Sequence, residues 1–219
     1  MEKHPNFSHE PLRNGNGTSG SSYKPMFAVP SSEVHTELSK YMLADGFSLV
    51  LDLDKSKGAT MVDATTGKNF LDFFTCFASI PVGINHPALT DPAFVEYIGR
   101  CALNKPSNSD LYTEEMATFV KTFFQLAVPS HFRYGFFIEG GAMAVENALK
   151  TAFDWKVRRN FKKGYTSEHG YKILHFRQAF HGRSGYTMSL TNTDPTKTKY
   201  FPHFDWPRVL NPAVRFPLD

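Results

Sequence analysis

The stretch that decides the fold is residues 136–150, FFIEGGAMAVENALK. Its first three residues form an apolar run typical of a buried strand, and Gly140 and Gly141 follow directly. Apolar residues then recur at helical spacing and predict a helix over about 141–163 with one core-facing stripe, Val145, Ala148, Leu149, Ala152 and Phe153. A strand, a glycine turn and a helix let the first free N–H groups of the helix bind an anion. The pattern predicts an α/β fold, with an anion site or an ordinary strand-to-helix turn at Gly141.

A second stretch favours the anion site. Residues 171–175 are another candidate strand, and residues 178–187, QAFHGRSGYT, follow it. Because successive strands of a parallel sheet end at the same edge, this loop is expected near the glycine turn. It carries the ring of Phe180, the imidazole of His181 and the guanidinium of Arg183. Such a set suits a flat, phosphorylated cofactor and a substrate that bears a carboxylate.

The remaining elements are expected in a regular order. The patterns predict a helix over 31–44, capped by Ser31 or Ser32, and three short strands over 47–54, 60–63 and 69–74, the last two joined by a hairpin turn at 65–68. Two further helices are predicted over 93–103 and 114–126. Residues 1–30 are polar and rich in Gly, Ser, Asn and Pro, which is typical of a disordered arm.

Composition excludes several classes of protein. The 219 residues are 41% hydrophobic and 21% charged with a net charge of +3, so we expect an ordinary globular protein that does not bind nucleic acid. Two cysteines, Cys76 and Cys101, make neither a disulfide framework nor a metal site. There is no signal peptide and no run long enough to span a membrane, so we expect a cytoplasmic location.

Five stretches in order carry a resemblance to a known family. They are residues 71–87, LDFFTCFASIPVGINHP; 102–112, ALNKPSNSDLY; 136–156, FFIEGGAMAVENALKTAFDWK; 179–193, AFHGRSGYTMSLTNT; and 201–208, FPHFDWPR. From about Ser32 onward the chain resembles the amino-terminal half of class III pyridoxal-phosphate aminotransferases. The resemblance implies a fold-type I transferase: residues 31–85 would be the helix and antiparallel meander of the small domain, and residues 86–219 part of the large, mainly parallel cofactor-binding domain.

The resemblance also implies site residues for pyridoxal 5'-phosphate and substrate. Gly141 and Ala142 would bind the cofactor phosphate through backbone N–H groups, and Phe180 would stack on the pyridine ring. Arg183 would bind the substrate's α-carboxylate. Three more residues would line the substrate pocket: Phe77, Ala78 and Asn108. Without the resemblance, Phe180 could equally be a core side chain, and Arg183 could form a salt bridge between loops.

Within the family, the motifs are most similar to the branch that transfers the ε-amino group of L-lysine to 2-oxoglutarate as a homodimer. The Schiff-base lysine of the family would lie beyond Asp219. We therefore expect no catalytic lysine in this chain and no activity of these residues alone. Three alternatives stay open: an aminotransferase for ornithine or another ω-amino acid, a non-catalytic fragment, and an unrelated phosphate-binding α/β domain.

Overall fold

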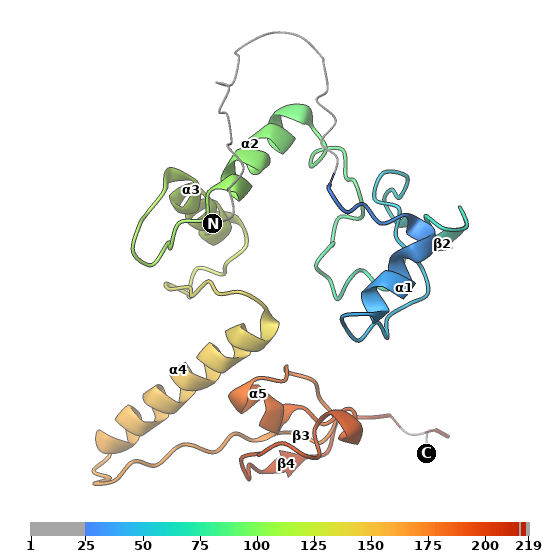
Figure 1. Ribbon diagram of the computed structural model, residues 1–219. Coiled ribbons are helices and arrows are strands. Elements are labelled where there is room, and N and C mark those ends of the chain that lie inside the picture. Colours follow the sequence, from blue (N-terminus) through green and yellow to red (C-terminus); the bar gives the residue numbers. More distant parts are fainter. Residues whose placement is uncertain (1–24, 215, 218–219) are drawn as a thin grey trace, which may run out of the picture. The chain divides into compact units, whose positions relative to one another are not determined.

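A computed structural model describes residues 25–214, 216 and 217 of the chain (Figure 1). The described residues form two compact units, which divide between Ala117 and Thr118. Most of the predicted arm, residues 1–24, lies outside the described residues. The domain boundary expected between residues 85 and 86 stays a prediction.

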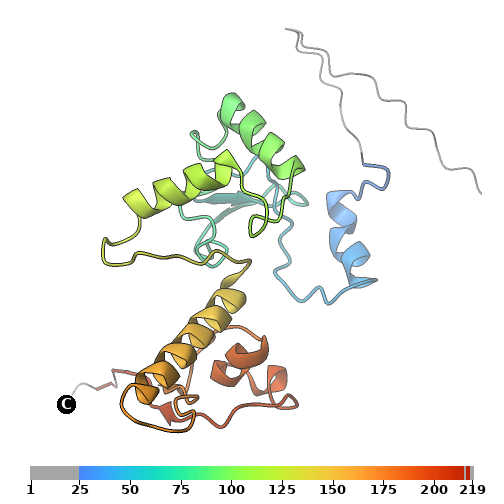
Figure 2. The same ribbon diagram turned by 90° about the vertical axis from the view of Figure 1, so that its left-hand side faces the viewer.

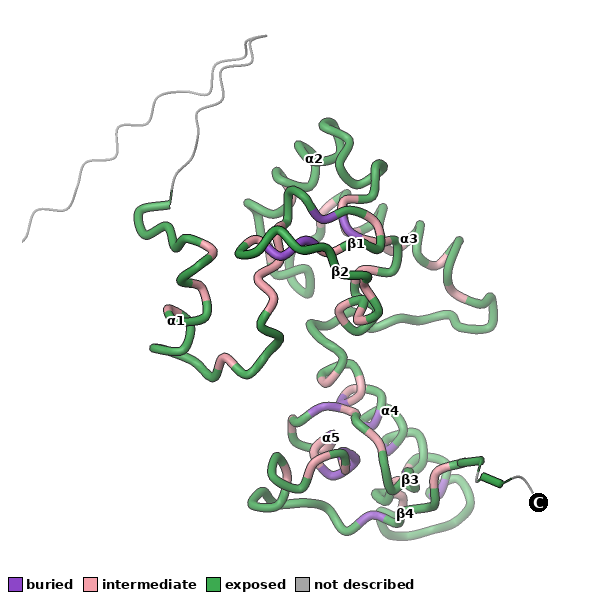
Figure 3. The backbone as a smooth tube through the Cα atoms, turned by 90° about the vertical axis from the view of Figure 1, so that its right-hand side faces the viewer, coloured by how far each residue is buried: buried purple, intermediate pink, exposed green. Residues whose placement is uncertain are grey.

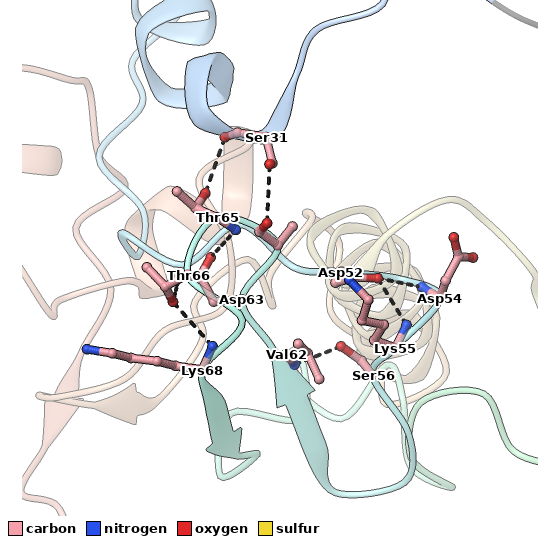
Figure 4. A network of polar contacts seen from close by, with 11 residues as sticks. Ser31, Asp52, Asp54, Lys55, Ser56, Val62, Asp63, Thr65, Thr66 and Lys68 are labelled. Atoms are coloured by element: carbon pink, nitrogen blue, oxygen red, sulfur yellow. Dashed lines mark hydrogen bonds and ion pairs between the residues drawn. The ribbon is translucent and has the colours of Figure 1, made fainter.

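The first unit contains a short antiparallel hairpin. Strand β1 (Thr60–Val62) pairs with β2 (Asn69–Leu71), with Met61 opposite Phe70. The predicted hairpin is therefore confirmed, and its turn is closed by hydrogen bonds to the Asp63 carboxylate (Figure 4). Val62 and Asp63 are among the few buried residues of this unit (Figure 3).

The predicted strand over residues 47–54 is wrong, apart from one bridge between Leu51 and Asp63. The reason is local. The Asp52 carboxylate accepts hydrogen bonds from the N–H groups of Asp54 and Lys55, at 3.1 and 3.0 Å, and so bends the chain into a turn.

The first predicted helix is shorter than expected. A 3₁₀ turn, η1 (Ser31–Glu33), leads into α1 (Val34–Ser39), which ends five residues before the predicted position 44. Neither Ser31 nor Ser32 caps it, because the N-cap residues are Pro30 for η1 and Glu33 for α1. The Ser31 hydroxyl instead donates to the carbonyl of Ala64 at 3.2 Å (Figure 4). This bond ties the start of the helix to the hairpin turn.

Two of the other predicted helices have the expected bounds within one residue. Helix α2 (Pro92–Leu103) begins after Asp91, whose carboxylate accepts hydrogen bonds from the N–H groups of Ala93 and Phe94. This is a standard N-cap, with proline at the first helical position. Helix α3 (Glu114–Leu126) has the predicted bounds.

The second unit is built on α4 (Gly141–Phe161), which was predicted over about 141–163. Helix α5 (Gly185–Leu190) lies beside the amino-terminal part of α4 (Figures 1 and 2). Leu149 and Phe153 of α4 and Leu190 of α5 form a buried core together with Trp206, from the segment before β4. A 3₁₀ turn, η2 (Pro195–Lys197), follows α5.

A parallel strand pair completes this unit. Strand β3 (His175–Phe176) pairs with β4 (Arg208–Val209), with His175 opposite Arg208. The Asn211 side chain then imitates a peptide group: its Oδ1 accepts from the N–H of Gln178 at 2.8 Å, and its Nδ2 donates to the Gln178 carbonyl at 2.6 Å. The backbone bonds between β3 and β4 are therefore followed by bonds to the Asn211 side chain.

Strand predictions in this unit are only partly correct. The predicted strand over 171–175 is confirmed at His175 alone, and its observed pairing extends to Phe176. Residues 136–138 are not a strand, because no strand within the described residues pairs with them. Their side chains are correspondingly exposed rather than buried. Helices and a parallel pair on one chain agree with the predicted α/β class.

Candidate functional site

The amino-terminal turn of α4 presents free backbone donors. Gly140 is the N-cap with φ of 76°, and its carbonyl accepts the N–H of Ala144 at 3.1 Å. Within the described residues, no acceptor takes the N–H groups of Gly141, Ala142 and Met143. These three groups stand at the positive end of a 21-residue helix, where an anion is stabilised. The predicted helix start at Gly141 is confirmed.

The space over this turn is open. A Cβ atom added at Gly140 or Gly141 would meet no atom within 4 Å. The positive φ of Gly140 also favours glycine, because side chains rarely adopt that conformation. The turn therefore leaves room for a ligand group directly against the backbone.

The second predicted loop lies against this turn. A Cβ atom added at Gly182 would be only 2.5 Å from Cβ of Ala142 and 3.0 Å from Oγ1 of Thr187. Gly182 has a φ of 117°, so glycine is required there for both conformation and space. This close approach brings the loop with Phe180 and Arg183 to the first turn of α4.

The two predicted side chains of that loop are accessible. Phe180 is 61% exposed, which excludes the alternative that it is a core residue of this unit. Arg183 is also exposed, and among the described residues no carboxylate lies within ion-pair distance of it. An aromatic face, a guanidinium and three free N–H groups are thus carried by neighbouring segments. Such a set can bind a phosphate, a flat ring and a carboxylate.

A buried network behind the loop was not predicted. The Glu146 carboxylate accepts hydrogen bonds from the Ser184 hydroxyl at 2.8 Å and from the Thr187 N–H at 3.0 Å. Glu146 is only 5% exposed. The sequence holds a signal for it, because Glu146 precedes Leu149 and Phe153 at helical spacing and so shares their buried face.

Phe77 and Ala78 lie in the first unit, in a left-handed turn. Four successive residues, Thr75 to Ala78, have φ between 47° and 63°. This conformation costs non-glycine residues roughly 1–2 kcal/mol each. The Phe77 side chain is 89% exposed and contacts Phe74 edge-on, with ring centroids 4.7 Å apart. Strain of this kind often marks functional segments.

Asn108, the last predicted site residue, is exposed in a polar loop of the first unit. The neighbouring Ser107 and Ser109 hydroxyls both donate to the Asp110 carboxylate, at 2.7 and 2.9 Å. These bonds lower the pKa of Asp110, the Ser107 bond most. The loop is therefore shaped by its own side chains, and the substrate-pocket role of Asn108 stays a prediction.

The described residues contain neither a metal-binding cluster nor a membrane-spanning helix. They hold no group of three or more His, Cys, Asp or Glu side chains placed to bind a metal ion. No helix in the same part of the chain is both long and apolar enough to cross a membrane.

The family follows from comparison with known proteins. The family model "Aminotransferase class-III" matches residues 42–217, which is most of the chain. The chain belongs to this family, whose enzymes depend on pyridoxal phosphate. The open turn with its three free N–H groups fits the phosphate of that cofactor, because a phosphate needs several donors and close backbone approach.

Within the family, the chain is similar to proteins named L-lysine-epsilon aminotransferase. The chain is 54% identical over 187 residues to the "L-lysine-epsilon aminotransferase" of Mycobacterium bovis and 50% identical over 188 residues to that of Streptomyces clavuligerus. Each alignment covers 85% of this chain but only 42% and 41% of the relative. The chain thus spans less than half the length of these relatives.

Solved structures show the same similarity to a lysine aminotransferase. "Lysine aminotransferase from M. tuberculosis in the internal aldimine form" matches with a TM-score of 0.82 and 52% identity, covering 87% of this chain and 44% of that one. An ornithine aminotransferase from Toxoplasma gondii, at 19% identity and a TM-score of 0.60, shows a shared fold only. The predicted fold class is confirmed by these neighbours.

Proposed function

We propose that this chain is part of an L-lysine 6-transaminase (lysine ε-aminotransferase), which transfers the ε-amino group of L-lysine to 2-oxoglutarate with pyridoxal phosphate. One structural observation carries the proposal: the open glycine turn of α4 lies against the loop with Phe180 and Arg183. The 54% identity to a relative named "L-lysine-epsilon aminotransferase" supports lysine as the amino donor.

In this function, the candidate site residues of the second unit have separate tasks. The N–H groups of Gly141 and Ala142 hold the cofactor phosphate, and the Phe180 ring packs on the pyridine ring, a contact worth roughly 0.5–1.5 kcal/mol beyond burial. Arg183 binds the α-carboxylate that lysine and 2-oxoglutarate share, because a planar guanidinium can donate two parallel hydrogen bonds. When bound, the cofactor supplies the electron sink for amino-group transfer.

Phe77, Ala78 and Asn108 complete the proposal as residues of the substrate pocket, in a cytoplasmic homodimer. No lysine of residues 1–219 lies at a motif position that resembles the Schiff-base lysine. Lys150, two turns into α4, is exposed. We therefore expect the polypeptide of residues 1–219 alone to show no transamination.

The amino donor is tested with the full-length gene product. We expect kcat/KM for L-lysine to exceed that for L-ornithine by roughly 10- to 200-fold, the usual range for discrimination by one methylene. The measurement is initial rates with 2-oxoglutarate and each donor, including 4-aminobutyrate. A higher value for L-ornithine or 4-aminobutyrate would contradict lysine specificity. Absence of turnover with every donor would support the non-catalytic alternative.

The phosphate site is tested by Gly141→Pro in the same protein. Proline is tolerated at the first position of a helix but lacks an N–H group. We expect pyridoxal phosphate to be lost on dialysis, seen as a fall in visible absorbance, while the unfolding midpoint changes little. Gly141→Ala is the comparison, because it keeps the N–H group and adds only a Cβ atom to the open space, and so separates loss of the donor from loss of room. Equal cofactor retention in both variants would refute the role of the Gly141 amide.

A further inference from the structure

Glu146 joins α4 to a distant part of the chain. Its Oε1 atom accepts both the Ser184 hydroxyl and the Thr187 N–H, which lie 38 and 41 residues further along. Glu146 is 5% exposed and Thr187 is fully buried. A buried carboxylate oxygen that accepts both donors links the start of α5 to α4. The two donors also bond within α5, where Ser184 Oγ lies 2.8 Å from Thr187 Oγ1, but only Glu146 joins them to the other helix.

The loop in front of α5 is held at its other end too. The Thr191 hydroxyl donates to the Gly182 carbonyl at 2.6 Å and accepts the His181 N–H at 3.0 Å. Thr191 is 2% exposed. Residues 181–187 are therefore fixed by Thr191 at one end and by Glu146 at the other, with Gly182 against Ala142 between them.

None of these fixing side chains offers a group to a ligand. The Phe180 ring and the Arg183 side chain of this loop are exposed, whereas His181 and Ser184 are half-buried. Glu146 lies on the same helix as the phosphate turn, five residues after Gly141. One helix therefore carries both the free N–H donors and the anchor of the loop.

We propose that Glu146 is a positioning residue, which holds the Phe180–Arg183 loop at a fixed place relative to the phosphate turn of α4. This inference rests on the proposed function for what the loop binds. The anchoring itself is independent of any ligand. The negative charge of the Glu146 carboxylate is not required for the anchoring, because the amide oxygen of glutamine can accept the same two hydrogen bonds.

The test compares Glu146→Gln with Glu146→Leu in the full-length gene product. Hydrogen exchange is measured for the peptide that spans residues 181–187, together with the affinity for pyridoxal phosphate. For Glu146→Leu we expect exchange of that peptide to accelerate by about 10- to 100-fold, as for loss of buried hydrogen bonds. Cofactor affinity should fall, and KM should rise for both carboxylate substrates. For Glu146→Gln, exchange should stay within about threefold of the native protein, by the same reasoning.

Each other outcome is decisive. Unchanged exchange and cofactor affinity in Glu146→Leu would overturn the proposal. Equally accelerated exchange in both variants would also overturn it, because the charge of Glu146, and not its two hydrogen bonds, would then hold the loop. If Glu146→Leu does not fold, Glu146→Ala removes the same two bonds without adding apolar bulk and leaves the Ser184–Thr187 cap of α5 intact, and it should still accelerate exchange at 181–187. If the native protein binds no pyridoxal phosphate, the proposed function fails, while the exchange comparison still tests the anchor.

Discussion

Two buried carboxylates organise the two units, and they do so over different distances. Asp63 accepts the N–H of Thr65 at 3.1 Å and the hydroxyl of Thr66 at 2.5 Å, two and three residues away (Figure 4). Glu146 also accepts one hydroxyl and one N–H, but from residues 38 and 41 positions away. They are 7% and 5% exposed.

The difference teaches what each carboxylate stabilises. Most donors to Asp63 belong to the turn that it closes, and only the Val50 N–H, at 3.2 Å, comes from further away. Its bonds can therefore form as soon as the hairpin forms. The bonds of Glu146 exist only when α5 has packed on α4. We expect changes around Asp63 to act on one turn, and changes around Glu146 to act on the whole second unit.

The largest effect is expected where α4 and the second loop touch. Gly182→Ala places a Cβ atom 2.5 Å from that of Ala142, at a φ of 117°. Overpacking and backbone strain together should lower the free energy of unfolding of the second unit by about 2–5 kcal/mol. Urea unfolding followed by tryptophan fluorescence would measure it, because Trp155 and Trp206 both lie in the second unit.

The double variant Gly182→Ala with Ala142→Gly separates the two causes. It removes the Cβ that clashes but leaves the positive φ, so we expect part of the lost stability to return. No recovery at all would mean that Ala142 is not the obstacle. An unfolding curve for Gly182→Ala that matches the native one would contradict the close approach itself.

A smaller effect is expected at the local carboxylate. Asp63→Ala leaves the Val50 and Thr65 N–H groups without their acceptor and should lower the unfolding midpoint of the first unit. Asp63→Asn keeps an oxygen for both N–H groups and should cost less. Hydrogen exchange of residues 60–71 is the measurement. Faster exchange at 181–187 in Asp63→Ala would contradict the local character of this turn.

The smallest expected effect is a loss of stability at low pH through Asp63. The Thr66 hydroxyl, then the Thr65 N–H, hold the pKa of Asp63 below its usual range. A carboxyl with a lowered folded pKa adds stability above its ordinary pKa, near 4, and this stability is lost as pH falls through the lowered value.

The acid effect is checked by urea unfolding of the native protein and of Asp63→Asn between neutral pH and about pH 3. The native protein should lose more stability than the variant over that interval. The comparison is needed because bonds to Lys55 also lower the pKa of Asp52. A Thr66→Val variant should raise the pKa of Asp63 in a titration followed by NMR. An unchanged value would mean that the hydroxyl is not the main cause.

The sequence predicted the long helices well, because α2, α3 and α4 each repeat apolar residues over three or more turns. It missed α5 and β4, which have six and two residues and are too short to show a period. Alternation alone predicts a strand over 47–54, but the Asp52 side chain forms a turn there by accepting the N–H groups of Asp54 and Lys55. Extended segments need a neighbouring strand, and single-sequence patterns do not supply it.

For the candidate site, the sequence predicted that the Gly141 turn and the Phe180–Arg183 loop would be neighbours. The contact of Gly182 with Ala142 bears this out for the backbone. The roles of the individual side chains remain proposals. The bonds of Glu146 could not be predicted, because they depend on packing across 38 or more residues, although its place on the buried stripe of α4 was visible.

The Asn211 side chain has one more consequence. Its Oδ1 and Nδ2 occupy both the N–H and the carbonyl of Gln178, so these two groups are closed to another backbone. Gln178 directly follows Arg177, whose N–H makes the last backbone bond to β4, at Val209. The pairing of β3 with β4 therefore stops one residue before Ala179, at the start of the loop that carries Phe180 and Arg183. The length of this strand pair is thus encoded by a single amide, which acts as a stop rather than as a connector.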